Sequence, residues 1–89
     1  MLFRSPSPII VLNRAIAVAE LDGPEVALAV VDRLDEKLAG YHAYHATRAD
    51  LLRRLGRSQE SRAAYGKAIE LAGNTAETAS LTRRRDRLG

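Results

Sequence analysis

The chain has 89 residues, enough for one domain with a small core, and it contains no cysteine, so a disulfide or thiolate metal site cannot brace it. No apolar run approaches the roughly 18 residues that span a bilayer, and the N-terminal apolar run is too short for a signal peptide. We therefore expect no membrane partner and a cytoplasmic location. Aromatic residues make up only 4% of the chain and alanine is abundant, which favours closely packed helices over a sheet.

The first predicted helix begins at Pro8, with Ser7 as its cap, and ends before Gly23. A second helix begins at Pro24 and continues to Gly40, and Asp22 with Glu25 forms a possible capping box at its start. Apolar residues at helical spacing predict the buried faces: Ile9, Leu12, Ala15, Ile16 and Ala19 in the first helix, and Ala27, Val31, Leu34 and Leu38 in the second.

Three more helices are predicted after Gly40. They run from about Tyr41 to Leu55, from Gly56 to Gly73 with Ser58 as the cap, and onward from Asn74, whose capping partner is Glu77. The last helix has the thin apolar content that is typical of a terminal capping helix. The expected buried residues are Tyr41, Tyr44, His45, Leu52 and Leu55, then Ser61, Tyr65 and Ala68, then Ala76, Ala79, Leu81 and Leu88.

A repeat of about 34 residues relates the first two helices to the next two. The breakers Gly23 and Gly56 lie 33 residues apart, and Ala15 and Ala49 lie 34 apart, which is the period of the tetratricopeptide repeat. The sequence therefore predicts an all-α fold of antiparallel helix hairpins, a tetratricopeptide-like right-handed superhelix of about five helices. We expect one such domain over residues 1–89, with residues 1–6 irregular or the remnant of a preceding helix.

The sequence contains no recognisable set of catalytic residues. His42 and His45 are three apart, but zinc needs three or four ligands, so packing or hydrogen bonding is the favoured role of these two residues. Asp50 and Arg54 have the spacing of a helical ion pair and lack a nearby nucleophile or base. We expect no enzyme activity, no cofactor and no metal.

Partner contacts are the expected function, through exposed faces of the first, third or fifth predicted helix. Asn13 and Arg14 interrupt an apolar helix, and a hydrogen bond from Asn13 to a loop backbone is the favoured alternative for that residue. Residues 45–89 carry ten Lys/Arg and five Asp/Glu, which gives a net charge of +5. Residues 1–44 carry four Lys/Arg and six Asp/Glu, which gives a net charge of −2. Most arginines in such a basic segment are expected to lie on solvent-exposed helix faces, because arginine is a good helix former. The candidate partner-binding residues are Asn13, Arg14, Tyr41, His42, Arg83, Arg84 and Arg85.

Four strings in order resemble one family. They are Leu12-Asn13-Arg14-Ala15, Glu20-Leu21-Asp22-Gly23-Pro24, Tyr41-His42-Ala43-Tyr44-His45-Ala46 and Arg48-Ala49-Asp50-Leu51-Leu52. Together they are similar to the tetratricopeptide-like C-terminal extension of extracytoplasmic-function (ECF) RNA polymerase sigma factors of bacteria.

The resemblance implies a regulatory or structural domain in transcription initiation. Its partners would be the sigma regions of the same parent chain and the RNA polymerase core, and promoter DNA would be met only through N-terminal regions absent here. The chain would then be an excised domain of a longer protein. Two alternatives stay open: a generic tetratricopeptide adaptor from another multidomain protein, and an accessory, non-specific nucleic-acid contact through the basic half.

Overall fold

The computed structural model describes residues 7–88, and the expectation for residues 1–6 lies outside that range. The described chain forms helices joined by short turns and contains no strand, which confirms the all-α class. The helices are α1 (Pro8–Asp22), α2 (Pro24–Asp32), α3 (Asp35–Leu38), α4 (His42–Arg54), α5 (Ser58–Leu71) and α6 (Thr75–Asp86).

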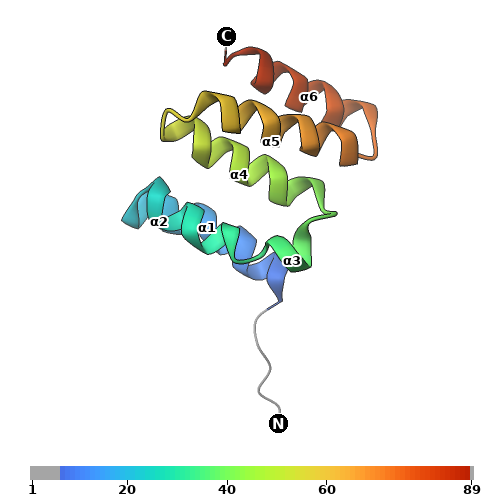
Figure 1. Ribbon diagram of the computed structural model, residues 1–89. Coiled ribbons are helices and arrows are strands. Elements are labelled where there is room, and N and C mark those ends of the chain that lie inside the picture. The colour runs from blue at the N-terminus through green and yellow to red at the C-terminus, as the bar shows by residue number, and fades with distance from the viewer. Residues whose placement is uncertain (1–6, 89) are drawn as a thin grey trace.

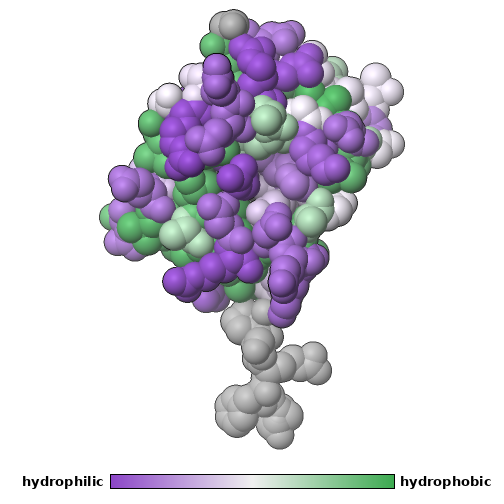
Figure 2. Space-filling view, viewed as in Figure 1, coloured by the Kyte–Doolittle hydropathy of each residue, from purple (hydrophilic) through white to green (hydrophobic). Residues whose placement is uncertain are grey.

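Antiparallel neighbours are the unit of the architecture. α1 packs on α2, α4 packs on α5, α2 contacts α4, and α6 lies along α5. Figure 1 shows α1 and α2 at one end of the molecule, α4 and α5 in the middle and α6 at the other end. Hydrophilic side chains cover most of the face seen in Figure 2, with hydrophobic ones between them.

The predicted glycine breaks are confirmed, and two of them need a left-handed backbone. Gly23 and Gly56 have φ of 96° and 77°, which costs glycine little and other residues much. At the end of α4 the Arg57 N–H donates to the Leu52 carbonyl (2.9 Å) and the Gly56 N–H donates to the Arg53 carbonyl (3.0 Å). This pair of bonds is the Schellman arrangement, which satisfies the last carbonyls of the helix.

Two predicted caps are confirmed and two are wrong. The Ser7 side chain accepts from the Ile9 N–H (3.3 Å), and the Asn74 side chain accepts from the Glu77 N–H (2.8 Å). α2 instead has Gly23 at its N-cap position and no side-chain cap, because that left-handed glycine replaces the expected capping box of Asp22. Ser58 is already inside α5, whose cap position is Arg57.

The second predicted helix is wrong in length, because it divides into α2 and the short α3. The turn lies at Arg33 and Leu34, where the Leu34 N–H donates to the Val31 carbonyl (2.9 Å) with the tighter three-residue spacing. Val30, Val31 and Asp32 are weak helix formers, so the segment tolerates the turn. The structure thus has six helices in the described residues, where the sequence predicts about five.

A buried cluster of small and aliphatic residues joins the hairpins. Of the predicted core, the buried residues are Leu12, Ala15, Ala19, Ala27, Val31, Leu34, Leu38, Tyr44, Leu52, Ser61, Tyr65, Ala68 and Leu81. Four further residues are buried that were not predicted to be: Leu28, Ala49, Leu51 and Ala64. These belong to α2, α4 and α5, which pack against neighbours on more than one side, whereas a single stripe was expected for each helix.

The predicted burial is wrong at Ile9 and Ile16, which are 45% and 54% exposed, and at Ala76 and Ala79, which are exposed. α1 packs on its neighbours through one face, so its apolar residues on the other sides remain uncovered. α6 packs through Leu81, and the two alanines lie away from it. Tyr41, His45, Leu55 and Leu88 are only partly buried, at the ends of helices or beside turns.

Ser61 is the one buried polar residue among residues 7–88, and its hydrogen bond links the second hairpin. Its hydroxyl donates to the Ala49 carbonyl of α4 at 2.7 Å. Ala49 and Ala68 are fully enclosed, so α4 and α5 approach each other through small side chains. The hairpin is therefore closely packed at its centre, and the buried Ser61 hydroxyl there has a hydrogen-bond partner.

Gly66 lies inside α5 with open space where a Cβ would be. We expect Gly66→Ala to raise the free energy of unfolding by about 0.5–1 kcal/mol, because alanine loses less backbone entropy on forming a helix. Thermal denaturation followed by circular dichroism measures this. A lower melting temperature would mean that a neighbour contacts that backbone in solution.

None of the helices in the described residues is long and apolar enough to cross a membrane.

Candidate protein-interaction groove

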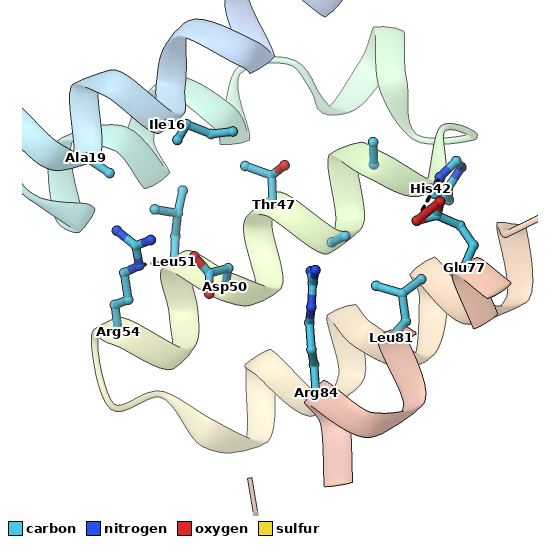
Figure 3. Close-up of a pocket in the computed structure, with 12 residues that line it drawn as sticks. Ile16, Ala19, His42, Thr47, Asp50, Leu51, Arg54, Glu77, Leu81 and Arg84 are labelled. Atoms are coloured by element: carbon cyan, nitrogen blue, oxygen red, sulfur yellow. Dashed lines mark ion pairs between the residues drawn. The ribbon is translucent and has the colours of Figure 1, made fainter. Parts of the chain in front are cut away.

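A groove of about 400 Å³ runs along α4, with α1 as one wall and α6 as the other (Figure 3). These are the first, third and last of the longer helices, whose exposed faces are the partner surfaces predicted from the sequence. α1 supplies Ile16 and Ala19, and α6 supplies Glu77, Leu81 and Arg84. The α4 residues are His42, Ala43, Ala46, Thr47, Asp50, Leu51 and Arg54.

Small side chains form the middle of the groove. Ala43, Ala46 and Thr47 follow one another at helical spacing on α4, so little side-chain bulk stands above the backbone there. Leu51 and Leu81 close the floor and are 3% and 2% exposed. Ile16 is half-exposed at the α1 edge, which leaves an apolar surface open to solvent.

Ion pairs neutralise the acidic residues at the α1 end of the groove. Asp50 accepts a hydrogen bond from Arg53 Nη2 (2.7 Å) and forms an ion pair with Arg54 Nε (3.0 Å), which confirms the pair expected from the spacing of Asp50 and Arg54. Arg54 also reaches Glu20 of α1 (3.3 Å). Hydrogen bonding to Asp50 raises the pKa of Arg53. The two carboxylates and two guanidinium groups balance, so this end has little net charge.

Arg84 is different, because it forms no ion pair within residues 7–88. Its side chain extends from α6 toward α4 in Figure 3, at the boundary between the groove and a second hollow that contains Tyr65 and Arg87. At the far end, His42 Nε2 lies 3.9 Å from Glu77 Oε1. The groove thus has an apolar floor and an arginine free to bind a carboxylate.

The structure brings two of the seven predicted partner residues into this groove, His42 and Arg84. Tyr41 precedes α4 and packs its ring edge-on against His42, with centroids 5.5 Å apart. Arg85 pairs with Asp86 (3.6 Å), and Arg83 is exposed outside the groove. The remaining two predicted residues, Asn13 and Arg14, are exposed on α1.

Asn13 does not have the expected structural role, because its side chain forms no hydrogen bond to another described residue. The groove residues Ile16, Glu77 and Leu81 were not predicted from the sequence to belong to a site. The small residues at positions 43, 46 and 47 were the available signal, since they mark a face of α4 that a long side chain does not cover.

A cluster on the other side of α4 holds α2 and α3 in place. The Tyr44 hydroxyl donates to Asp35 Oδ1 (3.2 Å), and Arg48 Nε donates to Asp32 Oδ1 (2.8 Å). His45 donates its Nε2 proton to the Ala39 carbonyl (2.6 Å), the hydrogen-bonding role predicted for that residue. Burial, and then the negative charge of Asp35, raises the pKa of Tyr44 to about 12. The residues here serve packing, because each polar group is already paired.

We expect Tyr44→Phe to lower the free energy of unfolding by about 1 kcal/mol at neutral pH, since it removes the hydrogen bond to Asp35. The phenol titrates near 10 in the unfolded chain and near 12 in the folded one. Its contribution is therefore complete below pH 10 and lost as the pH rises from 10 to 12.

Melting temperatures of both proteins between pH 7 and 12 test this. The wild type should lose its advantage over Tyr44→Phe above pH 10, whereas titrating lysines and other tyrosines affect both proteins alike. A gap that stays constant to pH 12 would contradict the assignment.

A metal site is not assembled in the described residues. Residues 7–88 contain no group of three or more His, Cys, Asp or Glu side chains that could hold a metal ion. His42 and His45 are occupied by different partners, Glu77 and Ala39. What the arrangement offers is an apolar, partly cationic surface.

The fold and the groove together define an all-helical domain with an open, partly apolar groove. The comparison with known proteins adds one relative. The chain is 49% identical over 83 residues to an uncharacterized protein of Rhizobium meliloti (strain 1021). The aligned region covers 93% of this chain and 20% of that protein. The chain therefore spans about a fifth of the length of the relative it matches. No protein-family model and no solved structure matches.

Proposed function

We propose that this chain is a protein-interaction domain of a bacterial ECF-type RNA polymerase sigma factor. It acts in transcription initiation by contacting the sigma regions of its own polypeptide or the polymerase core, in the bacterial cytoplasm. The four ordered strings described above support the sigma-factor family. The greater length of the Rhizobium meliloti protein supports the view that this chain is a segment of a larger factor. The observation that carries the protein-binding role is the open groove between α1, α4 and α6.

We also propose that the helices form a tetratricopeptide-like right-handed superhelix, with α6 as its terminal helix. Burial repeats with the 34-residue period: Ala15 and Ala49 are both enclosed, as are Ala27 and Ser61. Val31 and Tyr65, at 0% and 1% exposure, form a third such pair. These three pairs of equivalent positions therefore have the same buried environment in the two hairpins, as is typical of stacked repeats.

The groove explains how such a domain binds a partner protein without catalysing a reaction. Apolar side chains of a partner fill the space over Leu51 and Leu81, and the alanines of α4 allow a close approach. Arg84 supplies a cation for a carboxylate of the partner, while Arg54 stays paired with Asp50 and Glu20. Affinity then comes from apolar burial, and Arg84 adds selectivity for acidic segments.

Transcription in vitro tests the proposal on the Rhizobium meliloti protein. Three forms are purified: the full protein, the protein without its 83 matched residues, and a chimera with this chain in their place. Each is combined with polymerase core from the same bacterium, and core binding and transcript yield are measured. We expect the full protein to bind the core, the truncation to change the yield at least several-fold, and the chimera to restore it.

A full protein that does not bind the core would overturn the sigma-factor assignment. A truncation that transcribes as well as the full protein would overturn the regulatory role. The groove is tested within the chimera by Arg84→Ala, with Arg83→Ala as its matched control, because only Arg84 of the two lines the groove. Equal effects of the two changes would place the contact elsewhere.

A further inference from the structure

The two ends of the helix stack differ in chemistry. Ten of the 15 residues of α1 are Ala, Val, Leu or Ile, against three of 12 in α6. A stack of helices that ends in solvent is normally closed by a polar helix, and α6 fits that description. α1 does not, because apolar residues occur nearly all round it, as in a helix that is covered on two sides.

The uncovered side of α1 is continuous, and we call it the outer face of α1. It comprises Ile10, Asn13, Arg14, Ala17 and Leu21, which recur at helical spacing opposite the buried Leu12, Ala15 and Ala19. All five are exposed, with Ile10 at 52% and Leu21 at 83%. Two large apolar residues on either side of a small one form a surface that a second helix can approach closely.

The charge of Arg14 limits which kind of partner can cover the outer face of α1. Arg14 lies in its middle and has no ion-pair partner among residues 7–88. A second copy related by two-fold symmetry would place the outer face against itself, and that face has no carboxylate to offer Arg14. Glu20 of α1, which lies beside this face, is already paired with Arg54.

We propose that the outer face of α1 is an intramolecular docking surface, covered by an amphipathic helix from the rest of a longer polypeptide. The covering helix carries an apolar stripe against Ile10, Ala17 and Leu21 and a carboxylate against Arg14. Four-fifths of the Rhizobium meliloti relative lies outside the matched segment, which is ample to supply it. The inference rests on the proposed function only in that the chain is part of a longer protein, and it uses a surface other than the groove.

Thiol accessibility tests the proposal, because the chain has no cysteine of its own. Ala17→Cys places one thiol in the outer face, and Ala79→Cys, at an exposed alanine of α6, is the matched control. Each is made in the isolated chain and in the Rhizobium meliloti chimera. Alkylation by iodoacetamide is followed at the two positions by peptide mass spectrometry.

We expect the thiol at position 17 to react at least tenfold more slowly in the chimera than in the isolated chain, and the thiol at 79 to react equally in both. Ile10→Lys in the chimera should restore fast reaction at 17. Equal rates at 17 would overturn the proposal, as would slowing at both positions, which would indicate general burial. An isolated chain that sediments as a dimer and already protects position 17 would assign the face to a second copy. Because transcription is not measured, these outcomes are independent of the sigma-factor assignment.

Discussion

Replacing Ala68 by arginine is expected to unfold most of the domain at room temperature. Ala68 is 0% exposed on the side of α5 that faces the core, where α4 and α5 approach through small residues. An arginine there needs volume that the pair lacks, and it buries a charge without a partner. The cost is about 3–5 kcal/mol, comparable to the whole stability of a domain of this size without a staple.

Circular dichroism at 222 nm during heating measures the effect, and Ala63→Arg is the matched control. Ala63 is on the same helix but exposed, so the same change of side chain there should alter stability by no more than about 0.5 kcal/mol. A normal melting temperature for Ala68→Arg would show that α5 is turned away from the core in solution.

The sequence predicted the helices and most of their ends because these depend on neighbours in the chain. Gly23 and Gly56 are breakers through their own backbone freedom, and Ser7 and Asn74 are caps through bonds two or three residues away. The turn at Leu34 carries no such local signal. It lies in a run without glycine or proline, and contacts of Asp32 and Asp35 with α4 accompany it.

The groove was harder to predict than the helices, because it depends on how α6 and α1 are placed along α4. His42 and Arg84 were both candidates, yet nothing in the spacing of the sequence indicates that they line one groove. Ile16 shows the same limit: its helical position favours burial with Leu12, but no described side chain encloses it. Periodicity identifies an apolar face, and only the tertiary arrangement shows whether that face is covered.

Leu81→Ala is expected to release α6 while the α4–α5 hairpin stays folded. Leu81 is 2% exposed and is the only fully buried residue within Thr75–Asp86, so it is the main attachment of that helix to the core. Removing its side chain costs about 2–4 kcal/mol of burial, and an isolated helix of 12 residues is marginal in water. One wall of the groove and Arg84 would be lost with it.

Limited proteolysis with trypsin reads out this release, because Arg83, Arg84 and Arg85 are trypsin sites within α6. We expect cleavage after these arginines to be at least tenfold faster in Leu81→Ala, with the fragment ending there still showing protected sites in α4 and α5. Leu21→Ala makes the same chemical change at a leucine that is 83% exposed, and it should leave cleavage in α6 unchanged. If Leu81→Ala digests throughout at one rate, α6 unfolds together with the rest of the domain and is not a separable wall. That result would mean that a partner meets the groove as a rigid surface.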